Sequence, residues 1–488
     1  MQIAVSIACA LCLTVASQEC FRVLQSCSYR PQRGYFKILL SWYYLSLLVI
    51  QVVAALLYVF FDYYGYVCLV LYAAVAVFWS VFKRKCPLKL TKRVLRMFVA
   101  QFAVLAVLCV FVDLSFFVWL LPVVAIVSYF ICLPIDLLIA RHYIRRATTK
   151  LANSEVTVIA VTGSYGKTSV KDMLYALLKD SIAPTGSCNT PLGVASFVNK
   201  TDLTGVKYLV LEFGARKRGD IAELCALYKP KYGVVTGVCA QHLSTFKSLD
   251  NVIATKRELV EHLPDDGFCV LNSSDDYARA FADSGACKKY LSYDDLKLNV
   301  RKVGFDGTTL CVQTGGSSTE VRLPQISEYA QDTFAMCLQT VLRLGQSLDE
   351  TLIRVGNVKQ TPHRMELIKG AGCYVLDDSY NGSTVGVESC CKTLANFNCT
   401  KVVITQGLVE CGKQAREMNI RCGQLLGEAC DVAVVLGKNA KYLTEGLLAT
   451  KCIILPAKDL KQAVGLATQR VNGGILLFQN DLPDVVNV

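Results

Sequence analysis

The first third of this 488-residue chain contains five long stretches without a single charged residue. They cover residues 1–18, 38–61, 63–82, 97–112 and 114–135. A helix needs about 20 apolar residues to cross a bilayer, and a buried helix of a soluble protein seldom stays apolar on every face. The pattern therefore predicts about five transmembrane helices in residues 1–148. A cleavable signal peptide is the alternative for residues 1–18, although its usual positive leading segment is missing.

The charges are distributed unevenly along the chain. Residues 1–150 hold 15 of the 51 Lys and Arg residues but only 4 of the 39 Asp and Glu residues. The basic residues gather in segments 22–37, 83–96 and 141–150, which the positive-inside rule places in the cytoplasm. Everything after about residue 145 is then cytoplasmic. A nucleic-acid partner is not predicted, because a binding groove would need its excess positive charge on the soluble part.

The soluble part shows strands alternating with helices, which is typical of mostly parallel α/β sheets. Short apolar runs predict strands in two series: residues 156–161, 208–212, 232–238 and 268–271, then 373–376, 401–405, 432–436 and 474–478. The more polar stretch 286–325 predicts short antiparallel strands. We place two α/β domains at 149–358 and 359–488. The 23 cysteines are odd in number and irregularly spaced, which does not describe a disulfide scaffold.

A glycine-rich turn follows the first predicted strand. The residues Gly163-Ser164-Tyr165-Gly166-Lys167-Thr168-Ser169 lead directly into a predicted helix over 167–180. Such a turn wraps a phosphate with backbone N–H groups, a lysine adds a point charge for the β- and γ-phosphates, and a threonine hydroxyl can ligate Mg²⁺. The general P-loop pattern requires glycine at position 161, where this chain has valine. The shortened form still predicts a phosphate-binding loop.

Three further residues stand at places where α/β sheets bind ligands. Glu212 ends a predicted strand, at the edge where carboxylates face the ligand crevice, and is a candidate metal ligand. His242 follows the next predicted strand, 232–238, and alone it would more often be structural. Lys256 lies on a probable helix and alone would read as surface charge.

Eight ordered motifs together resemble the Mur ligase family. They are GSYGKTSVK, GSCNTPLG, LEFGA, the Gln241-His242-Leu243 turn, ATKREL, VLNSSDD, HRME and DDSYN, and they cover about residues 153–488. Their order is most similar to the MurF-type branch, which adds D-alanyl-D-alanine to a muramoyl tripeptide. The resemblance implies a P-loop central domain and a Rossmann-like C-terminal domain after the membrane region.

The resemblance also implies a mechanism: ATP converts a substrate carboxylate into an acyl phosphate, which an amine then attacks. It gives Lys167 and Thr168 roles with phosphate and Mg²⁺, and places Glu212, His242 and a carbamylated Lys256 at a second metal site. Asn189 would face the substrate, and Arg364 would reach the phosphates from the C-terminal domain. The nucleotide would also meet four residues of that domain: Asp377, Asp378, Tyr380 and Asn381.

The chain departs from the MurF-type pattern in three places. Membrane spans replace the small domain that holds the UDP part of the substrate, residues 329–333 read Tyr-Ala-Gln-Asp-Thr in place of a His-Asn element, and Ser383-Thr384 replaces Asn-Pro. Two alternatives therefore stay open beside a membrane-anchored MurF-type ligase of the bacterial cell membrane. One is a ligase acting on a lipid-linked or poly-γ-glutamate-type acceptor, and the other is a membrane ATPase or transporter.

Overall fold

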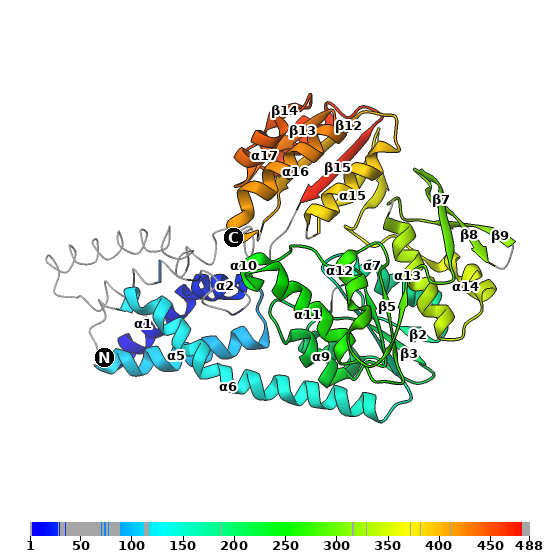
Figure 1. The fold of residues 1–488 in the computed structure, drawn as a ribbon. Coiled ribbons are helices and arrows are strands. Elements are labelled where there is room, and N and C mark those ends of the chain that lie inside the picture. The colour runs from blue at the N-terminus through cyan, green and yellow to red at the C-terminus, as the bar shows by residue number, and fades with distance from the viewer. Residues whose placement is uncertain are drawn as a thin grey trace. The chain divides into compact units, whose positions relative to one another are not determined.

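A computed structural model describes most of the chain as two compact units, Met1–His142 and Tyr143–Leu482. The described residues are 2–27, 29, 35, 70, 73–74, 77, 88–111, 117–186, 188–314, 317–327, 329–370, 372–380, 382–409 and 411–480. Figure 1 labels the elements within each unit.

The first unit is helical. It contains α1 (Gln2–Ala16), α2 (Gln18–Ser26), α5 (Lys92–Phe111) and the first part of α6 (Phe117–Ala152). Leu13, Phe21 and Met97 belong to its apolar core. Asp136 of α6 forms ion pairs with Arg93, at 2.7 Å, and with Arg96. The two helices are thus joined by charge as well as by apolar packing.

The number of spans predicted for this unit is not confirmed. Among the described residues, one helical stretch, Leu121–Ala152, is long and apolar enough to cross a membrane. Predicted spans 38–61 and 63–82 lie almost entirely outside the described residues. Helix α1 has only 15 residues, fewer than the about 20 that a span needs. The described part of the span expected at 114–135, residues 117–135, lies in α6, which continues to Ala152.

The second unit begins with a six-stranded parallel sheet in the order β2-β3-β1-β4-β5-β6. The bounds of these strands are β1 Thr157–Thr162, β2 Ser181–Ile182, β3 Tyr208–Glu212, β4 Tyr232–Val235, β5 Phe268–Leu271 and β6 Lys288–Leu291. Its helices are α7 Lys167–Leu177, α8 Pro191–Lys200, α9 Asp220–Tyr228, α10 Leu243–Phe246, α11 Leu249–Glu261 and α12 Asp276–Arg279, the last followed by the 3₁₀ turn Ala280–Asp283.

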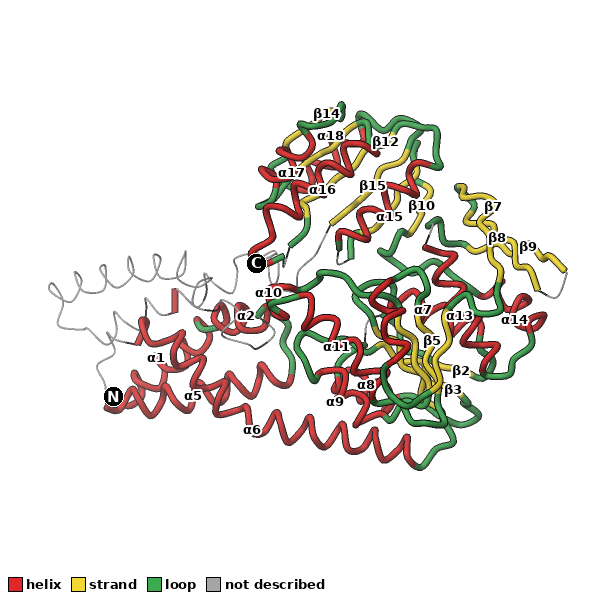
Figure 2. The backbone as a smooth tube through the Cα atoms, viewed as in Figure 1, coloured by secondary structure: helices red, strands yellow, loops and turns green. Residues whose placement is uncertain are grey.

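Alternation along β1 divides the core of this sheet into two layers, since successive side chains of a strand point to opposite faces. Ile159 and Val161 pack with α7 and with α13 (Tyr329–Arg343), whereas Val158 and Ala160 pack with α8, α9 and α11. Figure 2 shows these helices on either side of the sheet. The predicted helix 167–180 is three residues too long, because Leu178 turns to an extended conformation and β2 begins at Ser181.

An antiparallel three-stranded sheet follows, as predicted for the stretch 286–325, although β6 in the same stretch pairs parallel with β5. It consists of β7 Lys297–Gly304, β8 Gly307–Thr314 and β9 Ser317–Leu323. Helices α13 and α14 (Leu348–Arg354) and the 3₁₀ turn Val355–Asn357 then lead to the second large sheet.

The second large sheet has the order β10-β11-β15-β12-β13-β14 and is parallel except for the antiparallel pair β10–β11. Its strands are β10 Glu366–Lys369, β11 Tyr374–Asp378, β12 Lys401–Gly407, β13 Val432–Val435, β14 Ile453–Pro456 and β15 Ile475–Asn480. Its helices are α15 Thr384–Ala395, α16 Ala415–Ala429, α17 Ala440–Leu447 and α18 Leu460–Thr468, with a 3₁₀ turn at Gly412–Gln414. Helices α15, α16 and α17 cover one face and α18 covers the other. All eight predicted core strands are present: β3 and β5 have the predicted bounds, and the other six are shifted by one to three residues at one or both ends.

Candidate active site

The glycine turn links the carboxyl end of β1 to the N-terminus of α7. Gly163 and Gly166 adopt φ angles of 152° and 72°, a region that side chains disfavour. A Cβ at Gly163 would lie 2.0 Å from Thr236 Oγ1, so the close approach to the loop after β4 also requires glycine. Ser164 N donates to Gly237 O at 2.8 Å and joins the same two loops. Backbone N–H groups and the helix N-terminus together suit a phosphate.

Glu212 is the centre of the polar contacts beside this turn. Its side chain is 2% exposed at the end of β3. Thr168 Oγ1 donates to one of its carboxylate oxygens at 2.8 Å, and Asn189 Nδ2 donates to the other at 3.2 Å. Three residues chosen separately from the sequence are therefore in direct contact.

Lys256 is buried in the same region, contrary to what a surface helix would give. It lies on the inner face of α11 and is 3% exposed. The pKa of its amine is lowered to about 7, first by burial and then by the positive charge of Lys167, while Glu212 partly opposes the shift. The pKa of Lys167 is also lowered, first by burial and then by Arg364, again opposed by Glu212. Near pH 7 Lys256 therefore has a substantial fraction of neutral, nucleophilic amine.

The turn 361–364 brings Arg364 close to the charged side chains of Lys167 and Glu212. Arg364 Nη1 donates to Tyr380 O at 3.0 Å, and its guanidinium lies over the Tyr380 ring at 4.4 Å from the centroid. Burial raises the pKa of Asp378, and the charge of Arg364 opposes that shift. His363, with φ of 59°, contacts Asp377 Oδ2 through Nδ1 at 2.7 Å. Asn381, which the sequence also indicates, lies outside the described residues.

His242 occupies a different part of the site. It has φ of 53° at the N-terminus of α10. With Gln241 it lines a small cavity that Gly382, Ser383 and Cys411 bound from the other side. The contacts of Glu212 described above do not include it, so its predicted metal role stays a prediction.

The structure adds contacts that sequence patterns did not indicate. Tyr165 Oη donates to Asp275 Oδ2 at 2.9 Å, so the phenol braces the loop and leaves its backbone N–H for phosphate. Burial raises the pKa of the Cys239 thiol to about 11, while Lys167 and hydrogen bonds to Ser164 and Ser383 act against this shift. No spacing rule could have found these contacts, because they join positions far apart in the chain.

The donor set fits a magnesium ion. Mg²⁺ prefers oxygen ligands and a few carboxylates. The buried Glu212 carboxylate and the Thr168 hydroxyl supply such oxygens next to the glycine turn, 2.8 Å apart. The residues are thus suited to the group, with Glu212 as the charged ligand.

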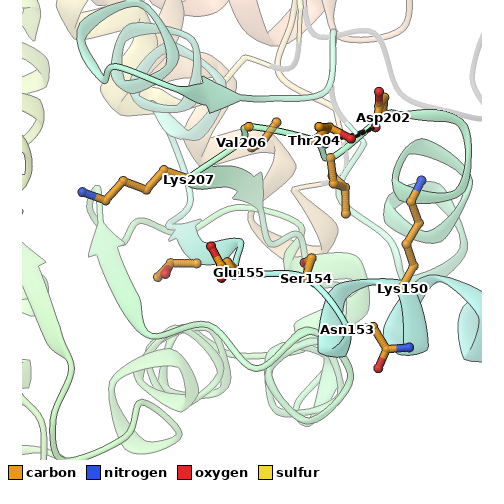
Figure 3. A pocket seen from close by; sticks show the side chains of 11 residues that line it. Lys150, Asn153, Ser154, Glu155, Asp202, Thr204, Val206 and Lys207 are labelled. Carbon is orange, nitrogen blue, oxygen red and sulfur yellow. Dashed lines mark hydrogen bonds between the residues drawn. The ribbon is translucent and has the colours of Figure 1, made fainter.

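A larger cavity of about 900 Å³ lies at the other end of the strands. It is lined by residues that precede β1 and β3, among them Lys150, Glu155, Asp202 and Lys207 (Figure 3). Asp202 accepts hydrogen bonds from Thr204, and Lys150 Nζ donates to the carbonyls of Val198 and Thr201, at 3.0 and 2.5 Å. These polar groups are used within the fold, and the cavity is separate from the glycine turn.

Comparison with known proteins agrees with this geometry. Residues 161–330 match the family described as Mur ligase middle domain. The chain is 27% identical over 298 residues to the UDP-N-acetylmuramoyl-tripeptide–D-alanyl-D-alanine ligase of Escherichia coli, covering 59% of this chain and 66% of that protein. It is 32% identical over 261 residues to the corresponding ligase of Mycobacterium bovis, covering 50% of each. The chain thus spans one half to just under two thirds of the length of these relatives.

The fold is also similar to a solved structure of a bound enzyme. The MurF ligase of Thermotoga maritima in complex with ADP superposes with a TM-score of 0.62 at 26% identity, covering 71% of this chain and 81% of that chain. Both large α/β sheets fall within the compact unit that carries the glycine turn. The chain is therefore similar to Mur ligases: residues 161–330 resemble their middle domain, and the fold resembles that of a MurF ligase.

Proposed function

We propose that the chain is an ATP-dependent C–N ligase that joins D-alanyl-D-alanine, or a similar amine, to the carboxylate of a muramoyl-peptide precursor of peptidoglycan. The observation that carries the proposal is the double contact of Glu212 with Thr168 and Asn189. It ties the phosphate loop to the segment expected to face the acceptor. The names of the E. coli and M. bovis relatives supply the two substrates.

The reaction follows from the weakness of a carboxylate as an acylating agent. An acceptor carboxylate oxygen attacks the γ-phosphorus of ATP, the bond to ADP breaks, and an acyl phosphate forms. The amine nitrogen then attacks the acyl carbon, loses a proton, and expels inorganic phosphate. The positive charges of Lys167 and Arg364 would stabilise the negative charge of the transferring phosphoryl group. Mg²⁺, held by Thr168 and Glu212, would neutralise phosphate charge.

Lys256 is the residue that we assign to carbamylation. Only an uncharged amine adds to CO₂, and the pKa of about 7 supplies one near neutral pH. The carbamate is an anion and would offset the charges of Lys167 and Arg364. Lys256→Ala should abolish turnover and be partly rescued by a short-chain carboxylic acid. Full activity without rescue would remove Lys256 from the site.

The deciding assay is ADP release by the detergent-solubilised chain. We expect release only with ATP, UDP-muramoyl tripeptide and D-alanyl-D-alanine together, and none from Lys167→Met. Release without either substrate would favour an ATPase or transporter. No release from protein that binds ATP would favour a lipid-linked or polymeric acceptor.

We also propose that the protein is a multi-pass protein of the bacterial cell membrane, which contacts lipid through α6 and its neighbours, with its catalytic domains in the cytoplasm. The α6 side chains of Phe130, Ile131 and Leu138 are 50–63% exposed, and large exposed apolar surfaces mark membrane or protein contacts. The protein should stay in the pellet after alkaline carbonate extraction. Release into the supernatant would contradict membrane insertion.

A further inference from the structure

Lys171 is a fully buried cation with no part in the proposed chemistry. It lies one turn after Lys167 on α7, and its side chain is 0% exposed. A buried ammonium is costly unless its three donors are satisfied. Lys171 Nζ donates to Pro184 O at 2.5 Å and to Gly186 O at 2.8 Å, and it forms an ion pair with Asp172 Oδ1 at 2.9 Å.

Both carbonyls belong to the segment that carries Asn189. The described residues 184–186 and 188–190 lie between β2 and α8, and we call them the acceptor segment. Lys171 holds its beginning through the carbonyls of Pro184 and Gly186. Its end is held by Asn189, whose side chain donates to Glu212 at 3.2 Å and whose carbonyl accepts from Gly214 N at 3.1 Å.

Asp172, the partner in the ion pair, also contacts the turn 361–364. Asp172 Oδ2 accepts a hydrogen bond from Thr361 Oγ1 at 3.2 Å. Thr361 is 7% exposed, and its carbonyl accepts from Arg364 N at 3.2 Å. The turn that carries Arg364 and the acceptor segment therefore both contact adjacent residues of α7, Asp172 and Lys171. One unbroken series of polar contacts runs from Gly186 through Lys171, Asp172 and Thr361 to Arg364.

We propose that Lys171 and Asp172 are positioning residues that couple the acceptor segment to the turn 361–364, so that nucleotide bound at the glycine turn orders both. The inference rests on the proposed function in one respect, that this site binds ATP. A contact that only braced α7 would hold each segment separately. Coupling instead requires that breaking the link at Thr361 disturbs the acceptor segment, which Thr361 does not touch.

Hydrogen exchange of the full-length protein in detergent, read by mass spectrometry, tests the coupling. The probe is a non-hydrolysable ATP analogue with Mg²⁺, whose binding is followed by fluorescence in the same samples. In the unmodified protein the analogue should slow exchange in both segments. Lys171→Met and Thr361→Val should each speed exchange of the acceptor segment in the bound state about fivefold or more, as expected for one lost hydrogen bond.

Two matched controls separate coupling from general loss of a buried bond. Lys150→Met removes another ammonium that donates to two carbonyls, at the far end of α8. Thr340→Val removes a buried hydroxyl that donates to Met336 O at 2.7 Å within α13. Both controls should leave exchange in the two segments unchanged.

The outcomes are distinct. If Thr361→Val leaves the acceptor segment protected while Lys171→Met does not, Lys171 is a local brace and the coupling is refuted. If Lys171→Met does not fold, Thr361→Val and Asp172→Asn decide the question. Unmodified protein that binds the analogue without ordering both segments refutes this inference alone. Failure to bind the analogue refutes the proposed function as well.

Discussion

Replacing Lys256 with methionine should stabilise the free protein near neutral pH while abolishing ligation. The amine is 3% exposed, and burial lowers its pKa from 10.5 to about 7. Methionine fills a similar volume and has no charge to bury. The buried amine of Lys256 therefore lowers the free energy of unfolding, a loss of stability that is common at functional sites.

The size and pH range of this effect follow from proton linkage. Between about pH 7 and pH 10.5 the unfolded chain binds a proton that the folded chain has lost, so stability rises with pH in this window. Below pH 7 both states are protonated and the full cost remains. These two pKa values give a cost of about 4 kcal/mol at pH 7.

Thermal unfolding in detergent and bicarbonate-free buffer measures the difference. The melting temperature of Lys256→Met should exceed that of the unmodified protein most at about pH 6, and the gap should shrink toward about pH 10. Lys207→Met, at an exposed lysine, is the control and should show no such trend. Bicarbonate should narrow the gap by consuming the neutral amine. An unmodified protein as stable as the variant at about pH 6 would show that the buried ammonium is fully compensated, and the reasoning would fail.

Three further predictions concern the polar contacts of the site. Glu212→Gln keeps the shape of the side chain but removes its charge, and should lower the rate of ADP release about 100-fold or more and weaken its response to Mg²⁺ in a metal titration. Arg364→Lys should lower kcat about tenfold, because an ammonium lacks the planar fork of guanidinium; an unchanged kcat in steady-state assays would place Arg364 outside the site. Tyr165→Phe removes the bond to Asp275 and should lower the unfolding free energy, measured by thermal unfolding, by about 1 kcal/mol.

Much of the second unit could be predicted from the sequence, because its sequence signals are local. Buried parallel strands are apolar throughout, and the turn at Gly163 and Gly166 must follow a strand and begin a helix. Motif order then indicated Thr168, Glu212 and Asn189, which the structure brings into contact. The burial of Lys256 was not predictable from its helix alone, since one charged residue among polar neighbours reads as surface.

The remaining features depend on tertiary contacts that no local pattern encodes. The bonds from Tyr165 to Asp275 and from Asp172 to Thr361 join residues more than 100 positions apart. Apolar content also predicted helix ends poorly: α6 runs on past residue 135 because its basic continuation favours helix as well. The number of membrane spans stays a prediction, because two of the five fall almost entirely outside the described residues.

The way α6 enters the second unit bears on how such a protein can evolve. Ala147 and Leu151 of its last turns belong to the same apolar core as β1 and α8. They precede the first strand, whereas the glycine turn and Glu212 lie where strands end. Recombination upstream of this helix end would exchange one N-terminal module for another without altering a catalytic residue. A ligase could in this way acquire a new subcellular location while its catalytic residues stayed the same.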